Sequence, residues 1–193
     1  MRPSGLELIY DYFEDHVRLA AHVRESRPVA MGVFGFIIGG LSLFVAQALT
    51  NRLHVLSFSW TSLAVTLVWK IAAGFLLAAV IHMFLELQGL KGNAVSTFIL
   101  FGFADVSWAL VVPAVLIAKS FSHSSLPITV IFLAVGFLTL SLKARSLQDG
   151  YQISSGRAWF MLGLPFFLAA AAALLALSLL VLKVVLAASA ALS

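Results

Sequence analysis

Two charged residues lie inside long apolar runs of this sequence. Lys70 is in the middle of VTLVWKIAAGF, residues 65–75, and Asp105 is in the middle of FGFADVSWAL, residues 101–110. A charge deep in a bilayer costs at least a few kcal/mol, so such a group must be paired, reach water or serve a transport pathway. Both residues are therefore candidate functional residues.

The two charges differ in their predicted depth. Counting about 20 residues back from Leu85 places Lys70 about 6 Å below one membrane surface, and its side chain leans toward that surface. Lys70 can therefore snorkel to water, pair with an acid or take part in transport. Asp105 lies about eleven residues into its run, near the midplane, and leans the opposite way.

An ion pair between Lys70 and Asp105 then requires a kinked or tilted helix. Two interpretations of Asp105 stay open. The first is a partner within the bundle, and the second is a proton or cation site. The candidate partners are Ser107, Thr97, Lys70 and a backbone group freed near Pro113.

His82 and Glu86 are four residues apart, on one face of a predicted helix. This spacing can contribute to a metal site, but the sequence indicates no third ligand. We expect an interfacial hydrogen-bonded pair. His123 has serine neighbours and no identifiable acid partner.

Motifs that carry catalysis are absent from the sequence. It contains no phosphate-binding loop of the Walker type, no HExxH zinc motif and no GxSxG nucleophile motif. We therefore expect no enzymatic activity, no metal and no cofactor.

The composition is typical of an integral membrane protein. The chain has 193 residues, of which 62% are hydrophobic and 10% are charged. Soluble domains are roughly half apolar and a quarter charged. The absence of cysteine excludes disulfides and thiolate metal sites. The sequence contains no basic stripe interleaved with aromatic residues, so it does not indicate nucleic-acid binding.

Five apolar runs predict an all-α fold, a transmembrane bundle of five spans within residues 28–193. The runs cover residues 28–50, 55–85, 94–118, 126–142 and about 158 to beyond 182. A span needs about 20 residues, so the fourth run is short and the second is long. Residues 55–64 are therefore predicted to form an interfacial lead-in anchored by Trp60.

Residues 1–27 are predicted to form a cytoplasmic amphipathic helix. Apolar residues recur there at spacings of three and four, with charged residues on the opposite face. The face can lie in the membrane interface or pack on the bundle. It consists of Leu6, Ile9, Phe13, Val17 and Ala20.

An odd number of spans places the two termini on opposite sides of the membrane. The positive-inside rule then predicts a cytoplasmic N-terminus and an external C-terminus. The inner side would carry Arg2, Arg18, Arg24, Arg27, Lys91, Lys143, Arg145 and Arg157, and the outer side Arg52, Lys119 and Lys183.

Gly35 and Gly39 form a GxxxG pair in the first span. Such pairs let two helices approach closely in lipid. Packing within the chain and a dimer interface are both consistent with this pattern.

The stretch IHMFLELQGLKGNAVSTFILFGFADVSWALVVPAVLIAK, which begins at Ile81, resembles the core of the Yip (Ypt-interacting protein) family of five-span membrane proteins. Gly89 and Gly92, on either side of Lys91, match the glycine-bearing cytoplasmic turn of that family. Pro113 matches its proline, and His82 matches a histidine that precedes the turn in bacterial members. The turn reads QGLKGN and lacks paired glycines, which points away from GTPase binding and toward the bacterial branch.

The resemblance implies a non-enzymatic scaffold or adaptor in membrane organisation or trafficking, located in a bacterial cytoplasmic (inner) membrane. Its expected contacts are the lipid bilayer and a membrane-protein partner or a second copy of the chain. The alternative is a small transporter or ion-conducting subunit that uses Asp105 together with Lys70. Gly102 and Pro113 would break the helix around that carboxylate.

Overall fold

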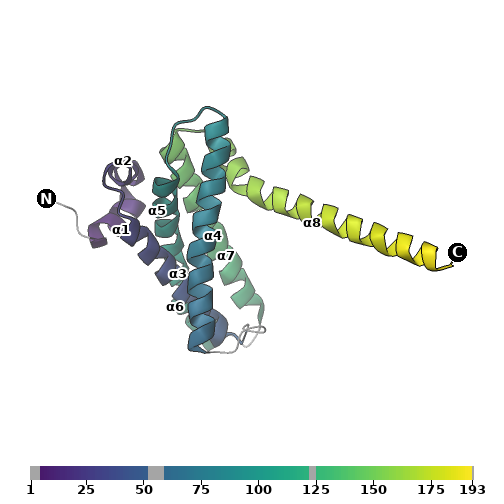
Figure 1. Ribbon diagram of the computed structural model, residues 1–193. Coiled ribbons are helices and arrows are strands. Elements are labelled where there is room, and N and C mark those ends of the chain that lie inside the picture. Colours follow the sequence, from purple (N-terminus) through teal and green to yellow (C-terminus); the bar gives the residue numbers. More distant parts are fainter. Residues whose placement is uncertain (1–4, 52–58, 122–124, 193) are drawn as a thin grey trace.

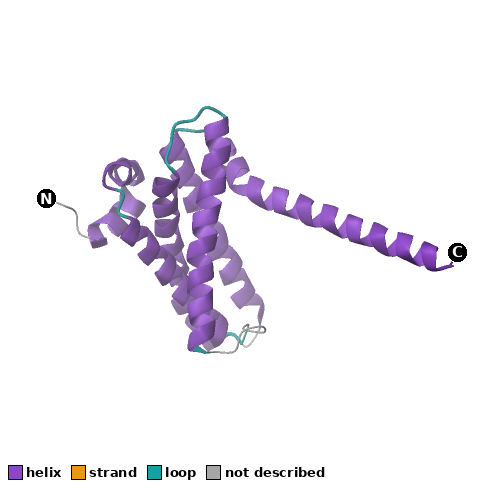
Figure 2. Cartoon of the chain, in the orientation of Figure 1, coloured by secondary structure: helices purple, strands orange, loops and turns teal. Residues whose placement is uncertain are grey.

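The computed structural model describes residues 5–51, 59–121 and 125–192 (Figure 1). Throughout these ranges the chain is helical apart from short turns, which confirms the all-α prediction (Figure 2). The elements are α1 (Gly5–Glu14), α2 (His16–Ser26), α3 (Val29–Leu49), α4 (Trp60–Leu87), α5 (Ala94–Asp105), the 3-10 helix η1 (Val106–Leu110), α6 (Val111–Phe121), α7 (Ser125–Tyr151) and α8 (Ser155–Leu192).

Five helical segments in the described chain are long and apolar enough to cross a membrane. Their mean hydropathy lies between 2.0 and 2.5. The third combines α5, η1 and α6 into one segment, Ala94–Phe121. The five predicted runs therefore correspond to five helical segments, and the protein has the architecture of a helical membrane protein.

The boundaries of the fourth and fifth spans differ from the prediction. Residues 143–151, expected in a loop, continue α7, which runs for 27 residues. These polar turns stay helical because the N-terminal helices pack against them and bury Ala144, Ser146 and Leu147. The α8 backbone begins at Ser155 and extends to Leu192, so the last ten residues mostly prolong the helix.

The N-terminal segment forms two helices instead of one. The break falls at Asp15, whose carboxylate accepts a hydrogen bond of 3.1 Å from the backbone N–H of Arg18 and caps α2. Part of the predicted apolar face does not pack on the bundle, since Phe13 is 50% exposed and Val17 is 64% exposed. The buried side chains are Leu8, Tyr12, His16, Leu19, Ala20 and Val23, and α2 packs on α5 and α7.

The centre of the bundle is α5, which contacts α2, α3, α4 and α7. Every residue from Ser96 to Asp105 is buried. The helix α3 lies directly on α5, because a Cβ atom added to Gly35 would fall on the carbonyl oxygen of Gly102, and one added to Gly39 would fall on that of Asp105. Gly35 and Gly39 thus serve helix packing within the chain, as small residues do in lipid.

Only the first turns of α8 belong to the bundle. Ala158, Met161 and Leu162 are buried against it, while the helix beyond Pro165 extends away from the other spans (Figure 1). None of the most apolar stretch of this span is buried inside the chain. Lipid or another protein must therefore cover the distal part of α8.

We predict that Gly35→Ala destabilises the bundle by about 1–3 kcal/mol, because the added methyl group forces α3 away from α5. Gly136→Ala is the matched control in α7, since its Cβ would meet the Trp108 side chain at an ordinary 3.7 Å. The free energy of unfolding of each variant is measured by denaturant titration in detergent micelles. Equal stability of the two variants would contradict the close α3–α5 contact.

Candidate functional site

Asp105 is held between two lysines inside the bundle. Its Oδ2 lies 2.6 Å from Nζ of Lys70, and its Oδ1 lies 2.7 Å from Nζ of Lys143. The carboxylate is 1% exposed, and the lysine side chains are 18% and 13% exposed. The ion pair that the sequence left open is therefore formed, and the snorkelling interpretation of Lys70 is wrong.

The snorkelling interpretation assumed that the Lys70 side chain leans along its helix toward the nearer membrane surface. The helix α4 runs from Trp60 to Leu87, and the Lys70 ammonium group instead reaches Asp105 on α5. The ammonium group also lies 5.2 Å from the centre of the Trp108 ring, a distance at which the ring face attracts a cation. Trp108 thus helps hold Lys70 toward the interior.

Lys143 was missed as a partner of Asp105, because it follows a short apolar run and was assigned to an inner loop. In the structure it lies within α7 and points into the bundle, with its Nζ 5.6 Å from the Phe101 ring centre. The only signal in the sequence was the shortness of the fourth run, which left room for the span to continue past Leu142.

The local helix geometry at Asp105 follows from Pro113. Proline lacks an N–H and its ring collides with the carbonyl four residues earlier, so the preceding turn cannot stay α-helical. The chain tightens there into the 3-10 helix η1, which begins directly after Asp105. The Ser107 hydroxyl donates a hydrogen bond of 2.7 Å to the Ala104 carbonyl. This places Asp105 at the junction of the two helical segments.

The other predicted partners of Asp105 are engaged elsewhere. The Ser107 hydroxyl lies 2.7 Å from that of Thr139, and the Thr97 hydroxyl donates to the Tyr151 hydroxyl at 3.1 Å. The carboxylate is therefore neutralised by the two lysines. With all three groups ionised, two positive charges and one negative charge leave a formal charge of +1, which repels an additional cation.

His82 and Glu86 are close but make only a long contact of 3.7 Å between Nε2 and Oε2. The shorter contact of His82 joins its Nδ1 to the Tyr151 hydroxyl at 2.8 Å. Among the described residues, no group of three histidine, aspartate or glutamate side chains gathers as a metal site. His82 thus serves mainly to hold Tyr151, and the Glu86 side chain is 72% exposed.

The predicted turn lies between α4 and α5. Gly89 has a φ of +77°, a left-handed conformation that favours glycine. Gly92 is needed for a different reason, since a Cβ there would collide with the Tyr151 ring. Lys91 lies between them, and its side chain lines a pocket at this end of the bundle.

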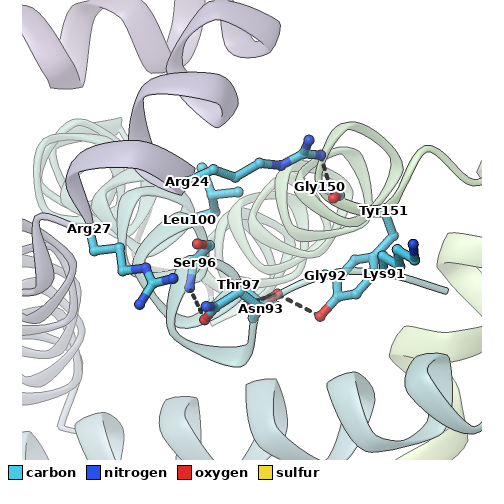
Figure 3. Close-up of a pocket in the computed structure, with 10 residues that line it drawn as sticks. All are labelled: Arg24, Arg27, Lys91, Gly92, Asn93, Ser96, Thr97, Leu100, Gly150 and Tyr151. Atoms are coloured by element: carbon cyan, nitrogen blue, oxygen red, sulfur yellow. Dashed lines mark hydrogen bonds between the residues drawn. The ribbon is translucent and has the colours of Figure 1, made fainter.

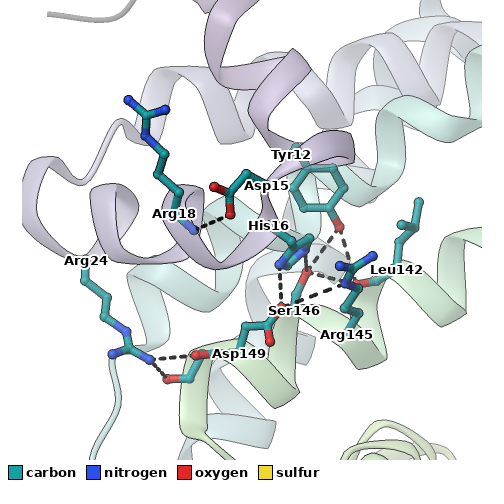
Figure 4. A network of polar contacts seen from close by, with 10 residues as sticks. Tyr12, Asp15, His16, Arg18, Arg24, Leu142, Arg145, Ser146 and Asp149 are labelled. Atoms are coloured by element: carbon teal, nitrogen blue, oxygen red, sulfur yellow. Dashed lines mark hydrogen bonds and ion pairs between the residues drawn. The ribbon is translucent and has the colours of Figure 1, made fainter.

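A second buried polar network joins the N-terminal helices to α7 (Figure 4). The Tyr12 hydroxyl lies 3.1 Å from the Ser146 hydroxyl, and His16 Nδ1 lies 2.8 Å from Asp149 Oδ2. Burial lowers the pKa of His16, an effect that the Asp149 carboxylate opposes in part. Burial also disfavours the charged form of Tyr12, so it raises the pKa of this phenol. This network was not predicted from the sequence, in which the i, i+4 spacing of Tyr12 and His16 was the available signal.

Comparison with known proteins provides no relative. No family model matches the chain, and no curated protein or solved structure matches it. The fold and the buried charges therefore show only the class of the protein, which is a helical integral membrane protein with an ion-paired core. Three residues that were considered from the sequence lie outside the described residues, namely Arg2, Arg52 and His123.

We predict that Asp105→Asn destabilises the bundle by about 3–5 kcal/mol, because it leaves two buried ammonium groups without a counter-charge. The triple variant Asp105→Asn, Lys70→Met, Lys143→Met removes all three charges and should recover most of that loss. Thermal and denaturant unfolding in detergent micelles measures both effects.

Ser107→Ala is the control for this experiment, because it removes a neighbouring hydroxyl without changing any charge. Its cost should be about 1 kcal/mol. If Asp105→Asn is no less stable than Ser107→Ala, the ion-paired cluster does not hold the bundle together.

Proposed function

We propose that this protein is a non-enzymatic membrane scaffold or adaptor whose bundle supports α8 for contact with another membrane protein. The observation that carries the proposal is that the distal part of α8 packs against no other helix in the described part of the chain. Its span is the most apolar of the five, with a mean hydropathy of 2.5, and none of its most apolar stretch is buried inside the chain. The run Ala169–Ala173 offers a small-residue surface to a second helix.

The closed state of the charge cluster supports a structural core. Each oxygen of Asp105 faces an ammonium group, and aromatic rings lie beside both lysines. Charges paired in this way hold α4, α5 and α7 in one arrangement. We therefore assign the contacts of the protein to its periphery, which includes α8 and the exposed side of α1 and α2 around Phe13.

The proposal includes a bacterial cytoplasmic membrane and a cytoplasmic N-terminus. Its support is the gathering of predicted inner cations at one end of the bundle. Arg24 and Lys91 line one pocket there, and Arg157 contacts Gln88 at the end of α4. The turn with Gly89 also supports the Yip-like interpretation, which is likewise part of the proposal.

The alternative function is a small transporter or ion-conducting subunit that uses Asp105. The observation that favours it is the interruption of the third span by η1 directly after this carboxylate. Interrupted helices form ion sites in transporters. The formal +1 charge of the cluster would require one lysine to move away before a cation could bind.

We predict that a photo-crosslinking residue at Leu175 of α8 yields a discrete protein adduct in native membranes. Leu133 of α7 is the matched control, because the two leucines are 63% and 68% exposed. Mass spectrometry should identify the same partner in repeated Leu175 adducts and only lipid adducts at Leu133. Lipid adducts alone at both positions would contradict the scaffold proposal.

A flux assay separates the two functions. We expect vesicles that contain the purified protein to hold a proton or Na⁺ gradient as long as protein-free vesicles do, because the cluster is closed by its own lysines. A leak that is present in the native protein and absent from the folded triple variant would favour the transporter instead.

A further inference from the structure

A pocket of about 320 Å³ lies at the end of the bundle where α2, the α4–α5 turn, the start of α5 and the end of α7 meet (Figure 3). Arg24 and Arg27 approach it from α2, and Lys91 from the turn. Within the part of the chain that the structure describes, no carboxylate lines this pocket. Its lining is therefore strongly positive.

The three cations differ in how they are engaged. Arg24 donates hydrogen bonds to the backbone carbonyls of Asp149 and Gly150, at the end of α7. Arg27 and Lys91 form no ion pair with any residue that the structure describes. Two cations with no counter-charge thus share one pocket with a third that is bound only by neutral carbonyls.

The pocket also lies at the N-terminus of α5, a 12-residue helix. The Asn93 side chain already accepts hydrogen bonds from the N–H groups of Val95 and Ser96, at 2.8 and 3.4 Å. The helix therefore contributes mainly the positive end of its dipole. Hydrogen bonds to a ligand must come from side chains.

Ser96 supplies an independent indication of a ligand. It lines the pocket and is only 6% exposed, yet its hydroxyl has no hydrogen-bond partner. Buried hydroxyl groups in native proteins are nearly always hydrogen-bonded, because an unmade bond costs free energy. An acceptor bound in the pocket would satisfy this donor.

One wall of the pocket is held in place by contacts from three elements. The Tyr151 hydroxyl contacts Nδ1 of His82 and accepts a hydrogen bond from Thr97, and the ring lies against Gly92. Figure 3 shows the Thr97 contact and places Tyr151 beside Lys91, across from Arg27. The pocket is therefore prearranged, which lowers the cost of binding.

We propose that this pocket binds a phosphate group, carried either by an anionic phospholipid headgroup or by a free solute. Arginine, lysine and hydroxyl donors at a helix N-terminus are the groups that recognise phosphate. The pocket lies at the first turn of a span, which is the level of lipid headgroups. The site is independent of the partner assigned to α8 and of the charge at Asp105.

The test measures binding to the full chain in uncharged detergent micelles, with dioctanoyl phosphatidylglycerol and inorganic phosphate as separate probes in calorimetry. We expect the double variant Arg27→Gln, Lys91→Gln to weaken binding about tenfold or more. Arg18→Gln is the matched control, since this exposed arginine of α2 does not line the pocket. Its affinity should stay within about twofold of the native value.

Ser96→Ala gives a second variant that keeps the fold. It should leave the unliganded protein as stable as before, or more stable, while it lowers the affinity several-fold. Binding of phosphatidylglycerol alone identifies a lipid headgroup, and binding of phosphate that competes with the lipid identifies a free phosphate. No binding of either probe, or an equal loss in the Arg18→Gln control, overturns the proposal.

Discussion

The structure depends on one requirement, that the Asp105 carboxylate be neutralised where water cannot reach it. A buried carboxylate without partners would carry a large desolvation cost, which neighbouring cations offset only at short range. Lys70 and Lys143 lie within 2.7 Å of its two oxygens and come from different helices. The cluster therefore joins α4, α5 and α7 at one point, and a change in the rotation of any of them would separate charges.

The helix α3 completes this arrangement because it carries glycines, which have no side chain, where it meets α5. Gly35 and Gly39 let its backbone touch that of α5, up to the carbonyl of Asp105 itself. Close approach excludes lipid and water from the carboxylate, which strengthens its attraction to the lysines. The glycine contact and the ion pairs thus depend on each other, although neither pattern in the sequence predicts the other.

The periphery of the bundle is held by different contacts from those of this core. The N-terminal helices dock on α7 through Tyr12 and His16, and the turn at Gly92 leaves space for Tyr151 at the same end of the bundle. Among the residues that the structure describes, the distal part of α8 has no such partner. The centre of the bundle is therefore closed, whereas its periphery offers a polar pocket and the exposed apolar distal part of α8. The proposed phosphate site and the proposed protein contact both lie there.

The amino-acid sequence by itself determined the class, the five apolar helices and the glycine turn, because hydropathy, helix breakers and positive φ are local properties. It also identified Lys70 and Asp105, since a charge in an apolar run is visible without coordinates. Only the tertiary structure decided that Lys143 joins them, that Tyr12 and His16 are buried, and that Ser96 lies unpartnered beside three cations. These contacts depend on helix tilt, rotation and span length, which are determined by packing between segments far apart in the chain.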